Sequence, residues 1–111
     1  TFSQFAGPLM KKLGMPTIFC NTLEVAPNGE ITGFKMRCEQ SKLTTVKALQ
    51  SIGFETIASG DSHNDLQMTD VVGISVCMAD GSASLKQRCD RIAPSVYEDG
   101  IAKEVAALGL I

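Results

Sequence analysis

The feature that most constrains this chain is the alternation of helix-period segments with short apolar runs along its second half. Residues 41–52 carry apolar side chains three or four positions apart, and residues 55–59 form a short run typical of a strand. A further helical segment and a second apolar run at 73–78 follow. Helices that alternate with short apolar strands are typical of a parallel sheet. The pattern therefore predicts an α/β fold.

Periodicity and turn residues predict the remaining elements. Apolar residues at helical spacing predict a helix up to Leu13, in which Pro8 predicts a kink or a restart. Residues 17–20 are predicted to form a short buried strand, and Asn28-Gly29 predicts the turn of an antiparallel ribbon near residues 22–37. We further expect a helix at 65–72, a short helix at 82–88, a short strand around Ile92 and a last helix with Ile101, Val105 and Leu108 on one face.

Composition and charge exclude several classes of protein. The chain has 111 residues, about one domain's worth, and its net charge of −2 argues against a nucleic-acid binder that neutralises phosphates. No apolar run approaches the roughly 18 residues of a membrane span. The cysteines Cys20, Cys38, Cys77 and Cys89 form no Cys-x-x-Cys pair, which argues against a zinc site. We expect them to be buried, reduced thiols in a cytoplasmic protein.

The segment richest in chemistry is 60–65, Gly-Asp-Ser-His-Asn-Asp, which directly follows the predicted strand at 55–59. Ligands of open α/β sheets bind beyond the carboxyl ends of strands, where Asp61 is expected. Asp65 lies four residues further on, in the first turn of the next helix. Two carboxylates and an amide this close suit Mg²⁺, which takes one or two protein carboxylates and keeps waters or phosphate oxygens. The helix N-terminus beside them favours an anion such as phosphate.

The same loop also has a purely structural explanation. Asp and Asn are common in turns and at helix N-termini, and Asp65 would stabilise a first turn through the helix dipole alone. Considered without any resemblance, the loop is therefore either a site for a cation and a phosphate or a capped turn.

Segment 60–65 resembles the fourth motif of haloacid dehalogenase superfamily phosphatases, Gly-Asp-x-x-x-Asp. Asn64 before the second Asp, with Met68 after it, is similar to the form in phosphoserine phosphatases. Lys42, at the start of a predicted helix, matches the lysine of the third motif, and the ribbon near residues 22–37 lies where the family has one. The first ten residues and the run at 16–21 are most similar to the branch of phosphoserine phosphatases and homoserine phosphotransferases. The resemblance extends over essentially the whole chain.

The resemblance implies a fold and a role for each matching residue. The fold would be a three-layer Rossmann-like parallel sheet with a small β-hairpin, and residues 1–111 would be the C-terminal part of the catalytic core. Asp61 would ligate Mg²⁺, and Asp65, also in the metal set, would orient a metal-bound water or neighbouring ligands. Asn64 would face the substrate phosphate, and Lys42 would lie against the phosphate and the nucleophile. His63 is expected at the rim of the site rather than as an acid or base.

The resemblance also implies parts that these residues do not contain. The family forms an aspartyl-phosphate on an Asp-x-Asp motif, and no two aspartates of this chain are two positions apart. We therefore expect the first strand and the cap to be missing, these residues alone to be inactive, and the open sheet edge to favour self-association.

The expected function of the whole protein is the Mg²⁺-dependent hydrolysis of a small phosphorylated metabolite, phosphoserine in serine biosynthesis. Phosphotransfer to homoserine or another small alcohol is the alternative within the same class of reaction. The alternative from another class is an inactive module that binds Mg²⁺, phosphate or a partner protein. No nucleic-acid or membrane partner is expected. The sequence leaves the exact substrate and the oligomeric state open.

Overall fold

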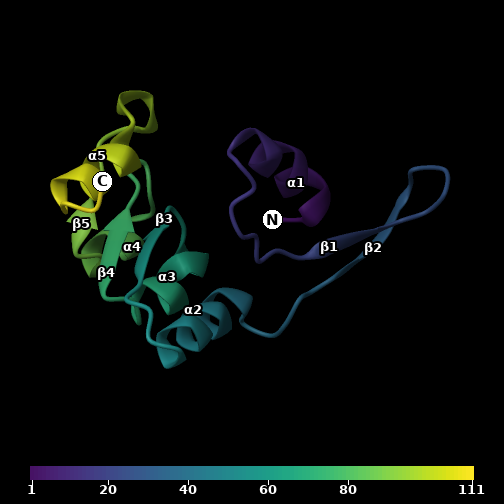
Figure 1. Ribbon diagram of the computed structural model, residues 1–111, viewed down its shortest axis with the longest axis horizontal. Coiled ribbons are helices and arrows are strands. Elements are labelled where there is room, and N and C mark those ends of the chain that lie inside the picture. Colours follow the sequence, from purple (N-terminus) through teal and green to yellow (C-terminus); the bar gives the residue numbers. More distant parts are fainter. The chain divides into compact units, whose positions relative to one another are not determined.

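The computed structural model describes all residues, 1–111, and the chain divides into two compact units, Thr1–Ser41 and Lys42–Ile111. Figure 1 shows the order of their elements along the chain. No helix of either unit is long and apolar enough to cross a membrane.

The first unit contains one helix and a two-stranded ribbon. Helix α1 (Ser3–Lys12) continues through Pro8 without interruption. Strands β1 (Thr22–Val25) and β2 (Ile31–Lys35) pair in antiparallel fashion, which confirms the predicted ribbon. Neighbouring residues alone form the turn of this ribbon. The Asn28 Oδ1 accepts a hydrogen bond from the Glu30 amide at 3.0 Å, and Gly29 adopts a φ of 88°. This left-handed backbone favours glycine over residues with a Cβ.

The strand predicted at residues 17–20 does not form. These residues have no ladder partner, and the only sheet-type contact nearby is a single bridge between Phe2 and Asn21. A strand exists only where a neighbour satisfies its amides and carbonyls, so apolar residues alone do not make one. The Gln4 side chain instead fastens α1 to β1, donating to the Leu23 carbonyl at 2.9 Å and accepting from the Leu23 amide at 3.1 Å.

The second unit is an α/β structure with a parallel sheet, as predicted. The sheet order is β3-β4-β5, and both pairings are parallel. The elements in chain order are α2 (Ser41–Ser51), β3 (Ile57–Gly60), a 3-10 turn (His63–Asp65), α3 (Leu66–Thr69), β4 (Ile74–Cys77), α4 (Ala83–Arg88), β5 (Arg91–Ile92), a 3-10 turn (Val96–Glu98) and α5 (Gly100–Ala107).

Helices cover both faces of the central strand β4. On one face Cys77, Leu66 of α3 and Leu85 of α4 form the buried core cluster. On the other face Val76, 2% exposed, is paired in register with Arg91, whose guanidinium binds Glu104 of α5 at 2.5 Å. Because successive strand residues point to opposite faces, this arrangement gives three layers.

Several local expectations are corrected by the structure. The helix predicted at 65–72 is confined to residues 66–69 after a 3-10 turn, and the Thr69 hydroxyl donates to the Asp65 carbonyl at 3.1 Å near its end. Such side-chain bonds to the backbone compete with helix continuation. In α2 the apolar stripe of Leu43, Val46, Leu49 and Ile52 has only Val46 buried, and Ile52 is exposed. All four cysteines are free thiols, but only Cys77 is buried and the other three are half-buried.

Candidate active site

The loops that follow β3 and β4 meet at the carboxyl edge of the sheet. The Met78 amide donates to the Gly60 carbonyl at 2.9 Å, and the Ser82 amide donates to the Asp61 carbonyl at 2.8 Å. Asp61 therefore stands at the end of β3, as predicted from the strand-then-loop pattern. Two backbone hydrogen bonds hold its loop to the loop that follows the central strand.

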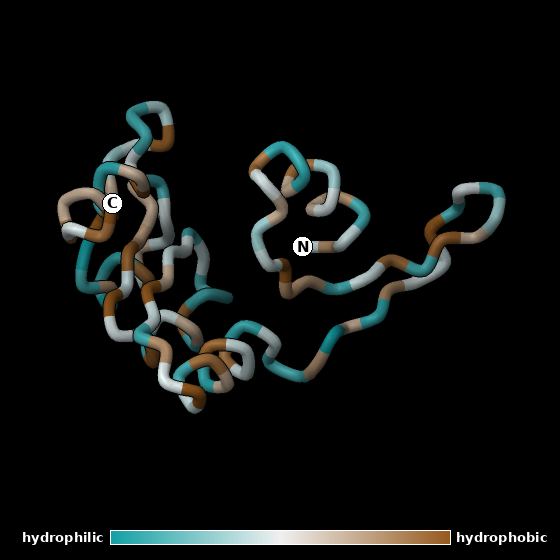
Figure 2. The backbone as a smooth tube through the Cα atoms, viewed as in Figure 1, coloured by the Kyte–Doolittle hydropathy of each residue, from teal (hydrophilic) through white to brown (hydrophobic).

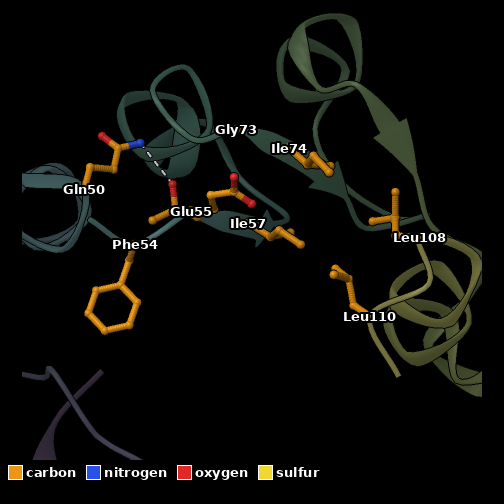
Figure 3. Close-up of a pocket in the computed structure, with 9 residues that line it drawn as sticks. Gln50, Phe54, Glu55, Ile57, Gly73, Ile74, Leu108 and Leu110 are labelled. Atoms are coloured by element: carbon orange, nitrogen blue, oxygen red, sulfur yellow. Dashed lines mark hydrogen bonds between the residues drawn. The ribbon is translucent and has the colours of Figure 1, made fainter. Parts of the chain in front are cut away.

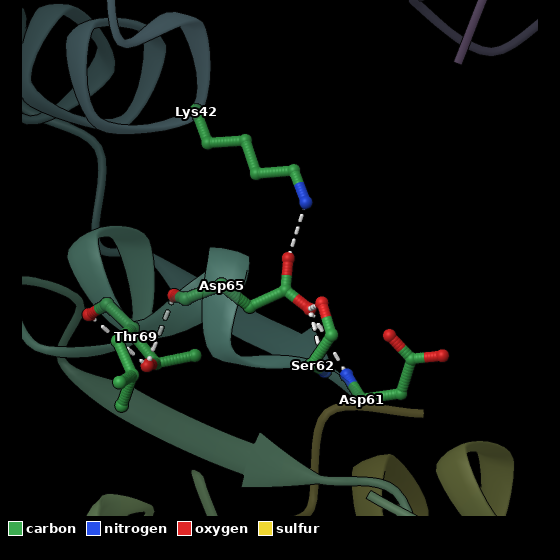
Figure 4. A network of polar contacts seen from close by, with 6 residues as sticks. Lys42, Asp61, Ser62, Asp65 and Thr69 are labelled. Carbon is green, nitrogen blue, oxygen red and sulfur yellow. Dashed lines mark hydrogen bonds and ion pairs between the residues drawn. The ribbon is translucent and has the colours of Figure 1, made fainter. Parts of the chain in front are cut away.

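Asp65 is the buried acid of this loop, with 4% of its surface exposed. Its Oδ2 accepts hydrogen bonds from the amides of Asp61 at 3.0 Å and Ser62 at 3.2 Å (Figure 4). A Cβ at Gly60 would lie 2.5 Å from the Asp65 Oδ2 and Cβ. Glycine at position 60 is thus what allows this carboxylate to fold back against the end of β3.

Lys42 makes an ion pair with the other carboxylate oxygen of Asp65, Oδ1 (Figure 4). Helix α2 supports this ion pair because hydrogen bonds from Gln50, near the C-terminal end of the helix, also hold the helix to the sheet unit. The Gln50 amide donates to the Thr56 hydroxyl at 3.0 Å and to the Val71 carbonyl at 2.7 Å, both of which precede strands. The helix therefore runs against the direction of β3 and brings its first turn to the carboxyl edge. The structure thus brings Lys42 to the acidic loop, while its predicted place against the phosphate and the nucleophile stays a prediction.

The pKa of the Asp65 carboxyl is the result of opposing effects. Burial raises it, but the hydrogen bond from Lys42 and the amides of Ser62 and Asp61 together outweigh burial, and the net pKa is lowered. Asp65 is therefore a carboxylate at neutral pH. Its charge holds the Lys42 ammonium at the candidate site. About half of the Lys42 side chain is exposed.

Asp61, His63 and Asn64 are exposed on the same loop. The Asp61 carboxylate accepts no hydrogen bond in the structure, so both of its oxygens are available. No group of three or more His, Cys, Asp or Glu side chains forms a complete metal site. One available carboxylate still fits Mg²⁺, which keeps waters and phosphate oxygens as its other ligands. Asp65 has both oxygens engaged, so a direct role in binding metal stays a prediction for it.

The sequence reasoning missed two supporting features. The Ser82 hydroxyl caps α4 by accepting a hydrogen bond from the Leu85 amide, and the Ser82 amide also donates to the Asp61 carbonyl. Buried Ser75 binds the Asp90 carboxylate with its amide and hydroxyl, both at 2.8 Å, and these bonds lower the pKa of Asp90. Nothing in the residue pattern signals either contact, because both join segments that are distant in the chain.

A separate pocket lies away from this site. It has a volume of about 570 Å³ and lies at the opposite, amino-terminal edge of β3 and β4 (Figure 3). Its walls are mainly apolar, with Ile57, Ile74, Leu108 and Leu110 among them. It holds no cluster of charged groups comparable to the one formed by Lys42, Asp61 and Asp65. The candidate site is instead an open edge with charged groups.

Comparison with known proteins places these features in a family. Residues 10–105 match the haloacid dehalogenase-like hydrolase family. Phosphoserine phosphatase ThrH of Pseudomonas aeruginosa is 40% identical over 68 residues, which cover 61% of this chain and 33% of the relative. A phosphoserine phosphatase of Pseudomonas syringae pv. tomato is 37% identical over 68 residues, covering 61% of this chain and 29% of the relative. The chain thus corresponds to about a third of the length of these relatives.

Solved structures show the same fold. A phosphoserine phosphatase in apo form superposes with a TM-score of 0.72 at 24% identity, over 87% of this chain and 52% of that one. The match covers much of the sequence, and the lysine, the acidic loop and the parallel sheet stand together in the structure. The chain belongs to the haloacid dehalogenase-like hydrolase family.

Proposed function

We propose that this chain is part of a Mg²⁺-dependent phosphatase that hydrolyses a small phosphomonoester, with phosphoserine as the substrate. One observation carries the proposal: the Lys42–Asp65 ion pair lies at the carboxyl end of β3, on the same loop as the unpartnered Asp61 carboxylate. A cation, a buried acid that holds it, and an available hard oxygen ligand together suit a phosphate group and its metal ion.

Each residue of the site has a role in this proposal. Asp61 holds Mg²⁺, which when bound supplies positive charge against the phosphate oxygens. Lys42 presents its ammonium to the phosphoryl group and offsets charge that develops during transfer. Asp65 positions Lys42 and the backbone of Asp61 and Ser62, and the exposed Asn64 amide faces the phosphate. The nucleophilic aspartate comes from a segment outside these 111 residues.

The substrate assignment rests on the named relatives. Two relatives at 37% and 40% identity are called phosphoserine phosphatases, and their matches cover 61% of this chain. Phosphoserine is a small, doubly charged phosphomonoester that carries an amino group, and an open edge with Lys42 and Asn64 can contact its phosphate. We propose a cytoplasmic role for the enzyme in serine biosynthesis on the same basis.

The test uses the protein encoded by the complete reading frame, with phosphoserine and p-nitrophenyl phosphate as substrates. Asp61→Asn removes one charge without changing side-chain size, and we expect it to abolish Mg²⁺-dependent phosphate release while the fold is kept. Asp99→Asn is the matched control, since Asp99 is exposed and asparagine tolerates its φ of 56°. Turnover like that of the unmodified protein in Asp61→Asn would refute the metal-binding role.

The same assay separates the substrate from the reaction class. Activity on p-nitrophenyl phosphate without activity on phosphoserine would keep the phosphatase and reject the substrate. Transfer of phosphate to added homoserine, with little free phosphate released, would replace hydrolysis by phosphotransfer. Absence of all phosphatase activity in a folded protein that binds Mg²⁺ would favour a binding module.

We also propose that the open edge of β3 pairs with a further strand. Strand β3 is at the end of the sheet order, and its Ile57 side chain is 40% exposed. Unpaired strand edges pair readily with other chains. Residues 1–111 expressed alone should therefore form concentration-dependent oligomers in light scattering. A monomer that unfolds cooperatively would contradict this proposal.

A further inference from the structure

We propose that Gly81 is a positioning residue for Asp61, and that the buried Cys77 sulfur next to Gly81 fixes where Gly81 lies. The inference rests on the proposed Mg²⁺ role of Asp61, but the contacts that carry it do not. Gly81 closes a turn after β4 in which its amide donates to the Met78 carbonyl at 2.9 Å. The next amide, that of Ser82, donates to the Asp61 carbonyl at 2.8 Å. The position of Gly81 is thus transmitted through one peptide unit to the backbone of Asp61.

The space around Gly81 admits no side chain. A Cβ at this position would lie 2.5 Å from the Cys77 Sγ, 3.0 Å from the Met78 carbonyl oxygen and 3.3 Å from the Asp61 carbonyl oxygen. Gly81 does not adopt a positive φ, so the requirement is for room and not for an unusual backbone conformation. Even alanine at this position must therefore displace one of these three groups.

The Cys77 side chain has little freedom to retreat. It is 0% exposed and packs against Leu66 and Leu85 in the core cluster. Its sulfur also contacts the Met78 carbonyl oxygen at 3.4 Å. Because close-packed cores resist displacement, the half-buried loop around Gly81 and Ser82 is the part that yields. A Cβ at Gly81 then moves Ser82 and weakens its hydrogen bond to Asp61.

The test measures first the Ser82–Asp61 hydrogen bond of the loop and then the affinity for Mg²⁺. Amide hydrogen exchange reports the Ser82–Asp61 bond, and Mg²⁺ titration by calorimetry reports the ligand position, both on the protein from the complete reading frame. In Gly81→Ala we expect faster exchange at Ser82 and a loss of about tenfold or more in Mg²⁺ affinity, as for other residues that orient a metal ligand. Gly7→Ala is the control, because a Cβ at Gly7 has nothing within 4 Å.

The decisive variant is Cys77→Ala combined with Gly81→Ala. Removing the sulfur frees the closest contact, so the double variant should recover Ser82 protection and most of the Mg²⁺ affinity that Gly81→Ala loses. A Cβ at Gly81 meets the Cys77 sulfur, so the two substitutions should be non-additive; Cys77→Ala alone, which leaves a cavity of its own, is the reference variant.

The outcomes separate this inference from the proposed function. Unchanged Ser82 exchange in Gly81→Ala, or a double variant that recovers nothing, would overturn the positioning role. If unmodified protein binds no Mg²⁺, the proposed function fails while the exchange data still decide about Gly81. If Gly81→Ala does not fold, a folded double variant with a protected Ser82 supports the inference, and an unfolded or unprotected one overturns it.

Discussion

The two units differ in how they use their hydrophobic residues. Both contain hydrophobic stretches, as Figure 2 shows, but every buried residue lies in Lys42–Ile111 and none in Thr1–Ser41. Phe5, Leu9 and Phe34 of the first unit are each more than half exposed, whereas Leu85 of the second is fully buried. Apolar periodicity is thus necessary for a core, but a second surface must be present to cover it.

The difference follows from the kind of contact each unit contains. The first unit is a helix and a hairpin, which form from neighbouring residues and a favourable turn. The second unit pairs parallel strands through helical crossovers, and the crossovers bring helices onto the sheet faces and exclude water. The candidate loop at residues 60–65 belongs to the unit with the core, which can hold side chains in place.

The largest expected effect comes from truncating matched leucines in the two units. Leu85→Ala should destabilise the second unit by about 2–5 kcal/mol, because it leaves a cavity in a fully buried site. Leu9→Ala, at a position 55% exposed, should change stability by about 0.5 kcal/mol or less. Urea denaturation of each variant measures both values. Equal effects would show that α1 has a buried partner in solution.

The next effect tests the buried acid against a surface one. Asp65→Asn removes the charge that binds Lys42 and two amides, and we expect a loss of about 1.5–3 kcal/mol in the free energy of unfolding. Asp70→Asn breaks the exposed ion pair with Arg88 (2.5 Å) and should lose no more than about 1 kcal/mol. If the two variants unfold at the same urea concentration, the Asp65 network does not stabilise the second unit.

The Asp65 carboxylate also predicts how the free energy of unfolding changes at acidic pH. The pKa of Asp65 is lowered in the folded chain, so its contribution is fully present above the unfolded pKa and disappears as pH falls through the folded pKa. The free energy of unfolding should therefore decrease below about pH 4, and less steeply in Asp65→Asn. Carboxyl resonances followed by NMR give the pKa itself; a value above that of an unfolded aspartate would contradict the network.

The smallest effect concerns the hairpin turn. Gly29→Ala places a Cβ on a residue with a φ of 88°, which should destabilise the ribbon by about 1 kcal/mol. Because the first unit has no core, the change should stay local and accelerate amide exchange in β1 and β2 alone. Gly7→Ala, in α1 with open space around the Cβ, is the control. Faster exchange in β4 as well would show that the two units are coupled.

The accuracy of the sequence predictions followed the range of the interactions involved. The ribbon was predictable because Asn28 and Gly29 specify its turn, and α4 was predictable because Ser82 caps it. The strand expected at 17–20 was wrong, since a strand depends on a partner that local residues do not supply. Ile52 keeps the helical apolar spacing but is exposed, because no other segment covers it.

For the site, the sequence by itself determined the chemistry: a lysine, two aspartates and an amide at a spacing that resembles a known motif. Only the tertiary structure decided which of these side chains is buried and paired and which is exposed. The fold buries Asp65 against Lys42 and the loop amides and leaves Asp61 open, although both are the same residue type. The physical reason is that burial and hydrogen bonding depend on distant segments, namely α2 for Lys42 and the loop after β4 for the Asp61 backbone. Residue type sets what a side chain can do, and packing sets which one does it.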